Sequence, residues 1–417
     1  MTMERILEPE RSIPVVADVE VLVCGGGVAG VAAAVCAARG GAKTMLLERY
    51  GFLGGLAING LVITTPPLDN GINREICETL RRRRVYARCE HSGEPIEMNA
   101  YDPEILKHEL VRMLGVAGVE LLLHVYIARA LLDQGAVTGV IIETKAGRQA
   151  VRARCVIDAT GDADVAASAA APFRLVKKPM TMMFNLVGVD TERALVSLGG
   201  NWRNVQKVVQ RAIEAGELAF ELSATPNFGS PGVSLEKLVH EGELNVWSGN
   251  LLDMDGTDPR DLTHAEIVTR EHTMRLAEFL RVAVPGFERS RIECTATQVG
   301  VRATRQVQGE ASPTLEEVRG RVFEETVVKP YTNLSLRLPY GSLVPQQVEN
   351  LLVAGRCISA EEEAMAQLRL IPVCLATGQA AGTAAAMAVQ QGVRPRRLQV
   401  KLLQAALAAQ GVALGLG

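Results

Sequence analysis

The sequence predicts an α/β protein with a parallel, Rossmann-type sheet, a β-meander and an inserted α+β substrate or cap domain. Three observations predict this fold: a glycine-rich turn between a buried strand and a small-residue helix, several strand-like runs after residue 119, and a change of composition near residue 172. A chain of 417 residues is long enough for two domains. We expect a first part of the sheet domain at 15–171, the insertion at 172–340, and the rest of the sheet domain at 341–417.

The first predicted elements form one βαβ unit. Val19–Cys24 is a continuous apolar run, which is typical of a parallel strand buried on both faces. The turn Gly25–Gly30 leads into a helix of small residues that runs through Ala38 and ends at Gly40–Gly41. A second strand, Lys43–Glu48, completes the unit.

Further elements follow along the first part of the sheet domain. A helix is expected from Asp102 to about Leu114, with Asp102 as N-cap and Pro103 at the first helical position. Strand-like runs separated by turn glycines predict a meander, and a last strand leads back into the sheet. These strands are Glu120–Tyr126, Ile127–Leu132, Val137–Thr144 and Cys155–Ile157.

The insertion and the C-terminal part have their own patterns. Helical periodicity predicts Asn204–Ala215 and Thr263–Val284 within the insertion. The last part returns to a strand at Asn350–Ala354 and to an Ala-rich helix. The uncharged stretch Leu370–Val389 is long enough to span a membrane, but its Ala and Gly content favours a buried helix packed closely on other backbone.

Composition excludes several classes of function. With 44 basic and 47 acidic residues, no charge bias points to nucleic acid or an anionic membrane. The eight cysteines form no CxxC pair, which argues against a zinc ribbon, an iron–sulfur cluster or a dithiol site. The six histidines show no metal-ligand spacing, so no metal is expected. We expect a cytoplasmic protein without a membrane span, and a homo-oligomer stays open.

The strongest chemical signal is Gly25-x-Gly27-x-x-Gly30 between a strand and a helix. Gly25 permits the tight turn, Gly27 lets the backbone approach a pyrophosphate, and Gly30 lets the helix pack on the strand. Glu48 follows 23 positions after Gly25, where a carboxylate can accept hydrogen bonds from ribose hydroxyls. The sequence therefore predicts a dinucleotide site, although this fingerprint does not distinguish NAD from FAD.

Two longer stretches carry a resemblance to a known family. The segments Glu48–Gly55 (ERYGFLGG) and Asn350–Ala386, together with Gly300–Arg305 (GVRATR), resemble the FAD-dependent oxidoreductases among the two-dinucleotide-binding-domain flavoproteins. These have a glutathione-reductase-like Rossmann domain, and the resemblance implies FAD as cofactor. The expected cofactor-binding residues are Gly25, Gly27, Val28, Ala29, Gly30, Glu48, Arg49, Gly54, Gly55, Leu56, Val125, Ala159, Thr160, Gly161, Gly355, Arg356, Gln379, Ala380, Ala381 and Gly382.

The resemblance also places the isoalloxazine ring. It implies contacts near Gly54–Leu56 and near the start of the Ala-rich helix, which we expect at Gln379–Gly382. The partial positive charge of a helix N-terminus would stabilise the negative charge of a reduced flavin there. The alternative is a helix whose small residues serve only close packing.

Candidate catalytic residues lie close to the family-like segments. Arg302, Arg305 and Arg369 could clamp a carboxylate or carbonyl, because the guanidinium fork matches that geometry. Glu362 is a candidate acid or base, although the family pattern has a histidine near this acidic turn. Structural ion pairs for the arginines and a solvated turn for Glu362 remain alternatives.

These observations predict an FAD-dependent oxidoreductase that transfers a hydride between a small organic substrate and the flavin. Because the chain has no second GxGxxG, we expect reoxidation by an acceptor other than NAD(P). Two alternatives stay open: an isomerase or hydratase that uses FAD without net redox, and an electron-transfer subunit of a larger complex.

Overall fold

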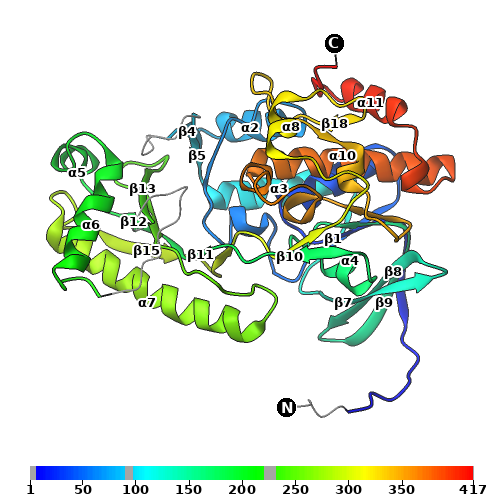
Figure 1. Cartoon of the computed structure of the whole chain (residues 1–417), viewed down its shortest axis with the longest axis horizontal. Coiled ribbons are helices and arrows are strands. Elements are labelled where there is room, and N and C mark those ends of the chain that lie inside the picture. Colours follow the sequence, from blue (N-terminus) through cyan, green and yellow to red (C-terminus); the bar gives the residue numbers. More distant parts are fainter. Residues whose placement is uncertain (1–5, 90–96, 220–231, 417) are drawn as a thin grey trace.

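The computed structural model describes residues 6–89, 97–219 and 232–416. It consists of two lobes: a larger one built around a mixed sheet and the long helix α10 (Ile371–Gln391), and a smaller one that carries α7 (Pro259–Ala283) along one side (Figure 1). The fold is the expected α/β arrangement, with a parallel-containing sheet in the larger lobe and an antiparallel sheet with helices in the smaller one.

The larger lobe is organised by parallel strands that end at the same edge. They are β6 (Glu120–Leu122), β2 (Thr44–Leu47), β1 (Val15–Cys24), β9 (Gly147–Asp158) and β20 (Leu351–Val353), in this order across the sheet. Cys24 is in register with Leu47 on one side and with Asp158 on the other. The turns that follow these strands therefore meet at one edge, which is where open α/β sheets bind ligands.

The meander differs in part from its prediction. It consists of β7 (Tyr126–Asp133), β8 (Ala136–Thr144) and the first half of β9, all antiparallel. The predicted strand at Glu120–Tyr126 is wrong as a meander strand, because β6 pairs in parallel with β2. β9 also begins eight residues before the predicted Cys155, since its first half, residues 147–152, pairs with β8.

Two apolar helices pack against each other beside the sheet. They are α1 (Val28–Arg39) and α10, and a Cβ added to Gly378 or Gly382 of α10 would overlap the carbonyl oxygens of Ala29 or Ala33 of α1. By length and hydropathy α10 could cross a membrane, but 83% of its most apolar window is buried inside the protein. Close packing of the two backbones accounts for its small residues.

The smaller lobe has its own hydrophobic core. Its sheet has the strand order β13-β14-β12-β15, and Phe184, Leu235 and Leu280 are among its fully buried side chains. The predicted helix at 204–215 is confirmed as α6, and α7 begins four residues before the predicted Thr263. The bounds are β12 (Met183–Val187), β13 (Val233–Lys237), β14 (Leu244–Ser248), β15 (Arg291–Thr295), α5 (Thr191–Ser197) and α6 (Val205–Glu214).

Two short antiparallel pairs connect the lobes. β10 (Phe173–Leu175) pairs with β17 (Arg305–Val307), and β11 (Met180–Thr181) pairs with β16 (Gly300–Val301). Side chains between Val307 and Tyr340 belong to the core of the larger lobe. We therefore propose that the inserted domain ends near residue 301 instead of residue 340.

The remaining elements cover the larger lobe. Asp102 caps α3 as predicted, because its side chain accepts hydrogen bonds from the backbone N–H groups of Glu104 and Ile105. Their bounds are β3 (Thr64–Thr65), α2 (Ile72–Arg82), β4 (Tyr86–Arg88), β5 (Asn99–Tyr101), α3 (Pro103–Ala117), α4 (Asp164–Ser168), α8 (Leu315–Gly320), β18 (Thr326–Val328), β19 (Leu338–Pro339), α9 (Met365–Leu368) and α11 (Val400–Ala409).

Candidate cofactor and active site

The turn after β1 is shaped by two glycines that the protein's own packing requires. Gly25 has φ +103°, and an added Cβ would lie 2.5 Å from the carbonyl oxygen of Ala159. An added Cβ at Gly30 would overlap the carbonyl oxygen of Gly25. Both positions therefore need glycine whether or not a ligand is bound.

Gly27 is different, because the protein leaves space beside it. The nearest atom to an added Cβ is the Cα of Gly55, 4.0 Å away. Gly27 is also the N-cap of α1, and no side-chain hydrogen bond caps this helix end. The first-turn N–H groups of α1 have no partner within the helix, so this end can bind an anion such as a diphosphate.

Glu48 lies at the end of β2 with its carboxylate oriented by backbone. Its Oε2 accepts a hydrogen bond from Gly26 N at 2.6 Å, and its Oε1 accepts one from Tyr50 N at 2.9 Å. The Glu48 side chain is buried, and the backbone carbonyl oxygen of Glu48 accepts a hydrogen bond from Val125 N at 3.0 Å. Each carboxylate oxygen keeps a lone pair, so a ribose hydroxyl can still donate to it. Arg49 is exposed and lies over the Tyr50 ring.

The loop after β2 lies directly against the glycine turn. Gly54 N donates to Gly26 O at 2.8 Å, and Gly54 has φ +109°. An added Cβ at Gly55 would lie 3.0 Å from the Cα of Gly27. The structure therefore brings the predicted Gly54–Leu56 segment next to the predicted diphosphate turn, with Leu56 half-buried.

Residues after β9 and β20 form the opposite side of this edge. Ala159 N donates to Cys24 O at 2.8 Å, and an added Cβ at Gly161 would lie 2.6 Å from the Arg356 guanidinium. Arg356 pairs with Asp162 at 3.3 Å and donates to Val301 O at 3.0 Å. Arg356 thus ties this edge of the sheet to the strands that connect the lobes.

Asp158 is a fully buried carboxylate at the end of β9. Its oxygens accept hydrogen bonds from the N–H and hydroxyl of Thr160 and from the N–H of Ala166. Burial raises its pKa to about 6, because loss of solvation exceeds the effect of these donors. Through these hydrogen bonds Asp158 fixes the conformation of the Thr160–Gly161 turn.

The prediction that the Ala-rich helix starts at Gln379–Gly382 is wrong. α10 begins at Ile371, so this segment lies in its third turn. The Gln379 carboxamide accepts from Ile72 N at 3.0 Å and donates to Gln410 Oε1 at 2.9 Å, while Ala380 and Ala381 are fully buried. Gly382 is required by packing on α1, so the close-packing alternative holds for this segment. The helix N-terminus available to a ligand is at Ile371.

Two cationic side chains lie near this helix start, Arg302, which is buried, and Arg369, which is half-buried. Arg302 is 8% exposed, donates to Pro179 O at 2.6 Å and to Thr181 Oγ1 at 2.7 Å. Burial lowers its pKa to about 9, and repulsion from Arg369 adds to this effect. Burial and repulsion from Arg356 lower the pKa of Arg369 to about 10. Among the residues with described placement, no carboxylate forms an ion pair with Arg369.

The other two predicted catalytic side chains are held in ion pairs. Arg305 pairs with Asp164 at 2.9 Å and donates to Asp162 O at 3.0 Å. Glu362 pairs with Lys178, and this contact lowers its pKa. These contacts favour structural roles for both side chains.

Sequence reasoning missed Tyr331, which lies beside the first turn of α10. The Asn73 carboxamide bridges Pro330 O at 3.1 Å and Pro372 O at 3.0 Å, which places the segment before Tyr331 against the helix start. The Tyr331 hydroxyl is buried without a hydrogen-bond partner, and burial raises its pKa, so it stays protonated. No motif or periodicity marks this residue in the sequence.

The sequence of the chain matches a known family and resembles the sequences of known proteins. The chain matches the family described as FAD dependent oxidoreductase over residues 20–334 and 328–407. It is 34% identical over 194 residues to digeranylgeranylglycerophospholipid reductase 2 of Methanopyrus kandleri, covering 42% of this chain and 46% of the relative. Reductase 1 of the same organism is 33% identical over 154 residues, 34% of this chain and 40% of that relative. The chain thus spans less than half the length of these relatives.

Two solved structures show the same fold at low identity. A geranylgeranyl bacteriochlorophyll reductase-like protein from Thermoplasma acidophilum has a TM-score of 0.55 at 14% identity, covering 95% of this chain and 85% of that one. A p-nitrophenol 4-monooxygenase from Pseudomonas putida has a TM-score of 0.54 at 15% identity, covering 94% and 84%.

Proposed function

The chain belongs to the FAD dependent oxidoreductase family, and on that premise we propose that it transfers a hydride between FAD and a small anionic organic substrate. The open space beside Gly27 carries the proposal, because the protein fills the space beside Gly25 and Gly30 but leaves this one for a ligand. Bound FAD would supply the ring that accepts or donates the hydride.

The residues present fit FAD in three places. The first-turn N–H groups of α1 would bind the pyrophosphate, and Glu48 would accept hydrogen bonds from the adenosine ribose. The first turn of α10 would face the pyrimidine edge of the ring, because its Ile371 and Val373 N–H groups have no partner within the helix. We retain Arg49 and Val125 as adenosine contacts, Gly355 as a pyrophosphate contact and Thr160 as a further cofactor contact.

The substrate class follows from Arg302 and Arg369. The guanidinium groups of buried Arg302 and half-buried Arg369 gain from an anion placed between them, and both stay charged at neutral pH. Arg302 is already fixed by Pro179 O and Thr181, which limits the entropy that binding has to remove. A carboxylate or phosphate on the substrate would orient its reacting carbon toward the flavin.

A carboxylate probe tests this assignment. Benzoate is titrated into the FAD-loaded protein and followed by the flavin absorbance, with benzamide as the neutral probe. We expect saturable binding of benzoate that Arg369→Gln weakens at least about tenfold, the scale of one charge-assisted hydrogen bond. Arg281→Gln, at an exposed arginine of α7, is the matched control and should change nothing. Equal binding of benzoate by Arg369→Gln and the unchanged protein contradicts the clamp.

The electron acceptor is proposed to be oxygen, a quinone or a partner protein, since the sequence has one GxGxxG turn. Anaerobic stopped-flow mixing with NADPH and NADH tests this: we expect no flavin bleaching within seconds. Rapid bleaching at physiological nicotinamide concentration contradicts it. A product isomeric with its substrate, without acceptor consumption, would establish the isomerase or hydratase alternative. Purification in tight association with an iron–sulfur protein would establish the electron-transfer alternative.

We also propose a cytoplasmic location. All eight cysteines are free thiols in the structure, and seven of them are buried. Cysteines without disulfide bonds are typical of proteins in a reducing compartment. Non-reducing and reducing electrophoresis of the protein from cells should give the same band, and a disulfide-dependent shift would contradict the assignment.

A further inference from the structure

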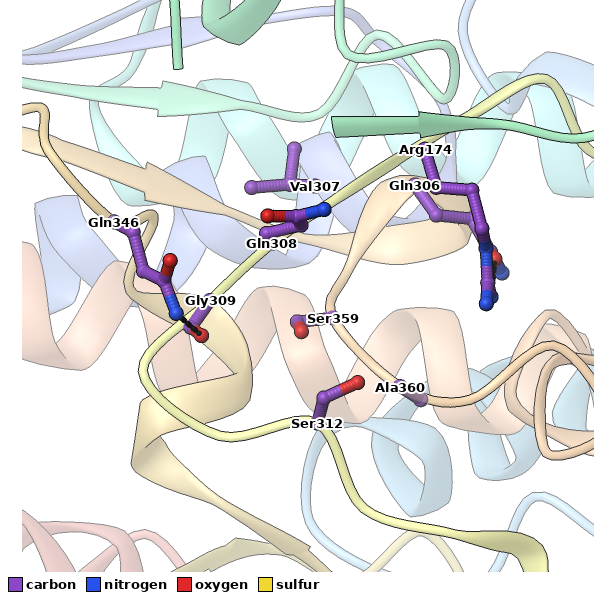
Figure 2. A pocket seen from close by; sticks show the side chains of 9 residues that line it. All are labelled: Arg174, Gln306, Val307, Gln308, Gly309, Ser312, Gln346, Ser359 and Ala360. Atoms are coloured by element: carbon purple, nitrogen blue, oxygen red, sulfur yellow. Dashed lines mark hydrogen bonds between the residues drawn. The ribbon is translucent and has the colours of Figure 1, made fainter. Parts of the chain in front are cut away.

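A half-open cavity of about 260 Å³ lies where the lobe-connecting strands meet the segment after β20. Figure 2 shows its walls, with Arg174 and Gln306 together on one side and Gln346 on the other. None of its lining residues is among the predicted FAD contacts or the candidate arginines of the active site. The lining residues are Arg174, Gln306, Val307, Gln308, Gly309, Ser312, Gln346, Ser359 and Ala360.

Arg174 gives the cavity a positive charge that the described part of the chain does not neutralise directly. Its Nη2 donates to Gln306 Oε1 at 2.5 Å, and no carboxylate of the described residues forms an ion pair with it. The nearby Glu362 pairs with Lys178, and the positive charge of Arg174 also contributes to lowering the pKa of Glu362. Arg174 itself is exposed, so the charge lies at the mouth of the cavity.

Gln306 supplies an unused donor beside Arg174. It is 2% exposed, and its Nε2 has no hydrogen-bond partner. The contact from Arg174 fixes which carboxamide atom is oxygen, so the nitrogen must be the free group. A buried amide N–H without a partner is uncommon in native structures and calls for an acceptor. Ser359, 1% exposed, and Ser312 add hydroxyl groups to the lining of the cavity.

We propose that this cavity is a second ligand site that binds a small organic oxyanion, a short carboxylate or phosphate ester. The guanidinium matches an oxyanion in charge and geometry, and the carboxamide and hydroxyl donors match its remaining oxygens. The volume admits a molecule of a few heavy atoms and excludes a dinucleotide. The site is independent of the proposed flavin chemistry, because it shares no residue with it.

Calorimetric titration of the FAD-loaded full chain tests the proposal. The probes are succinate, glycerol 3-phosphate and inorganic phosphate, with succinamide as the neutral analogue, all in 0.15 M salt to screen diffuse attraction. We expect saturable binding of succinate or glycerol 3-phosphate and none of succinamide. The probe that binds more tightly distinguishes a carboxylate from a phosphate ligand. Failure of all three anions to bind, or equal binding of succinamide, overturns the proposal.

Variants locate the bound anion. Arg174→Gln and Gln306→Leu should each weaken binding at least about tenfold, the effect expected when one charge-assisted or buried hydrogen bond is lost. Lys177→Gln, which removes a charge from the same segment outside the cavity, should leave binding unchanged. Arg369→Gln removes the proposed substrate clamp, and it should leave in place the binding event that Arg174→Gln weakens. Loss of binding in Arg369→Gln but not in Arg174→Gln would place the anion in the flavin site and overturn the inference, while leaving the proposed function standing.

Discussion

Gly27 is the glycine of the turn at which a substitution should affect ligand binding but not folding. Its backbone is extended, with φ −63° and ψ 174°, which any residue adopts, and an added Cβ meets no protein atom closer than 4.0 Å. Gly27→Val should therefore change the unfolding free energy of the flavin-free protein by less than about 1 kcal/mol, the usual size of an unstrained surface change. The valine methyl groups would instead occupy the space assigned to the pyrophosphate.

The loss of cofactor affinity follows from the displaced contacts. Two hydrogen bonds from α1 N–H groups to a charged phosphate contribute about 1.5–3 kcal/mol each. Losing both weakens FAD binding by at least about 100-fold, since each 1.4 kcal/mol is a factor of ten. Gly30→Ala should behave in the opposite way, because its Cβ would overlap the carbonyl oxygen of Gly25 and destabilise the fold by about 1–3 kcal/mol or more.

The assay compares these variants with Gly115→Val, which adds the same side chain at a helical glycine of α3 with no atom within 4 Å. Thermal unfolding is measured on flavin-free protein, because bound cofactor stabilises by mass action. FAD affinity is measured by quenching of FAD fluorescence. The reasoning is refuted if Gly27→Val retains FAD like Gly115→Val, or if its flavin-free form is as unstable as Gly30→Ala.

Four further predictions follow from named contacts. Asp158 has a folded pKa of about 6 against about 3.9 when unfolded, so its stabilising effect is complete below pH 3.9 and is lost as pH rises through 6. From pH 4 to pH 7 the free energy of unfolding of the unchanged protein should therefore fall by roughly 2 kcal/mol relative to Asp158→Asn, and an equal difference between the two proteins at both pH values would contradict this. Gly382→Ala should lower the thermal midpoint by several degrees, because its Cβ overlaps Ala33 O, whereas Gly115→Ala should not lower it; equal midpoints would show that α1 and α10 can separate at no cost. Tyr331→Phe should leave the thermal midpoint unchanged or higher, since the buried hydroxyl has no hydrogen-bond partner; a lower midpoint would contradict this. Cys294 is the exposed thiol, so a thiol reagent should label one cysteine quickly in the native protein and eight after denaturation, and labelling that persists in Cys294→Ser would contradict the burial of the others.

The first βαβ unit was predictable because local signals and tertiary demands coincide there. The apolar run of β1 is a local signal, and Gly30 reports a constraint within a few residues, because an added Cβ would overlap the carbonyl oxygen of Gly25. Gly25 is required by the distant Ala159, and here the local motif and the tertiary contact call for the same residue. The same holds for the Asp102 cap of α3. The FAD dependent oxidoreductase family was recognised from Glu48–Gly55 and Asn350–Ala386, and the family match confirms it.

The errors came where a local signal allows two structures. A proline such as Pro372 interrupts the interior of a helix but is well suited to its first turn. The sequence therefore predicts the start of α10 at Gln379, eight residues later than the observed start at Ile371. The first half of β9 is not predicted, because its polar residues are typical of a loop and only the pairing with β8 makes it a strand. The Arg174–Gln306 cavity and the surroundings of Tyr331 are formed by residues more than one hundred positions apart in the sequence. No short sequence pattern indicates such contacts.

The central claim is that a dinucleotide lies with its phosphates at α1 and its ribose at Glu48. Titration of flavin-free protein with FAD, FMN and ADP tests it most directly. FAD should bind at least about 100-fold more tightly than FMN, because FMN lacks the second phosphate and the adenosine that these contacts hold, and ADP should compete with FAD. Equal affinity for FMN and FAD, with no competition by ADP, would contradict the account.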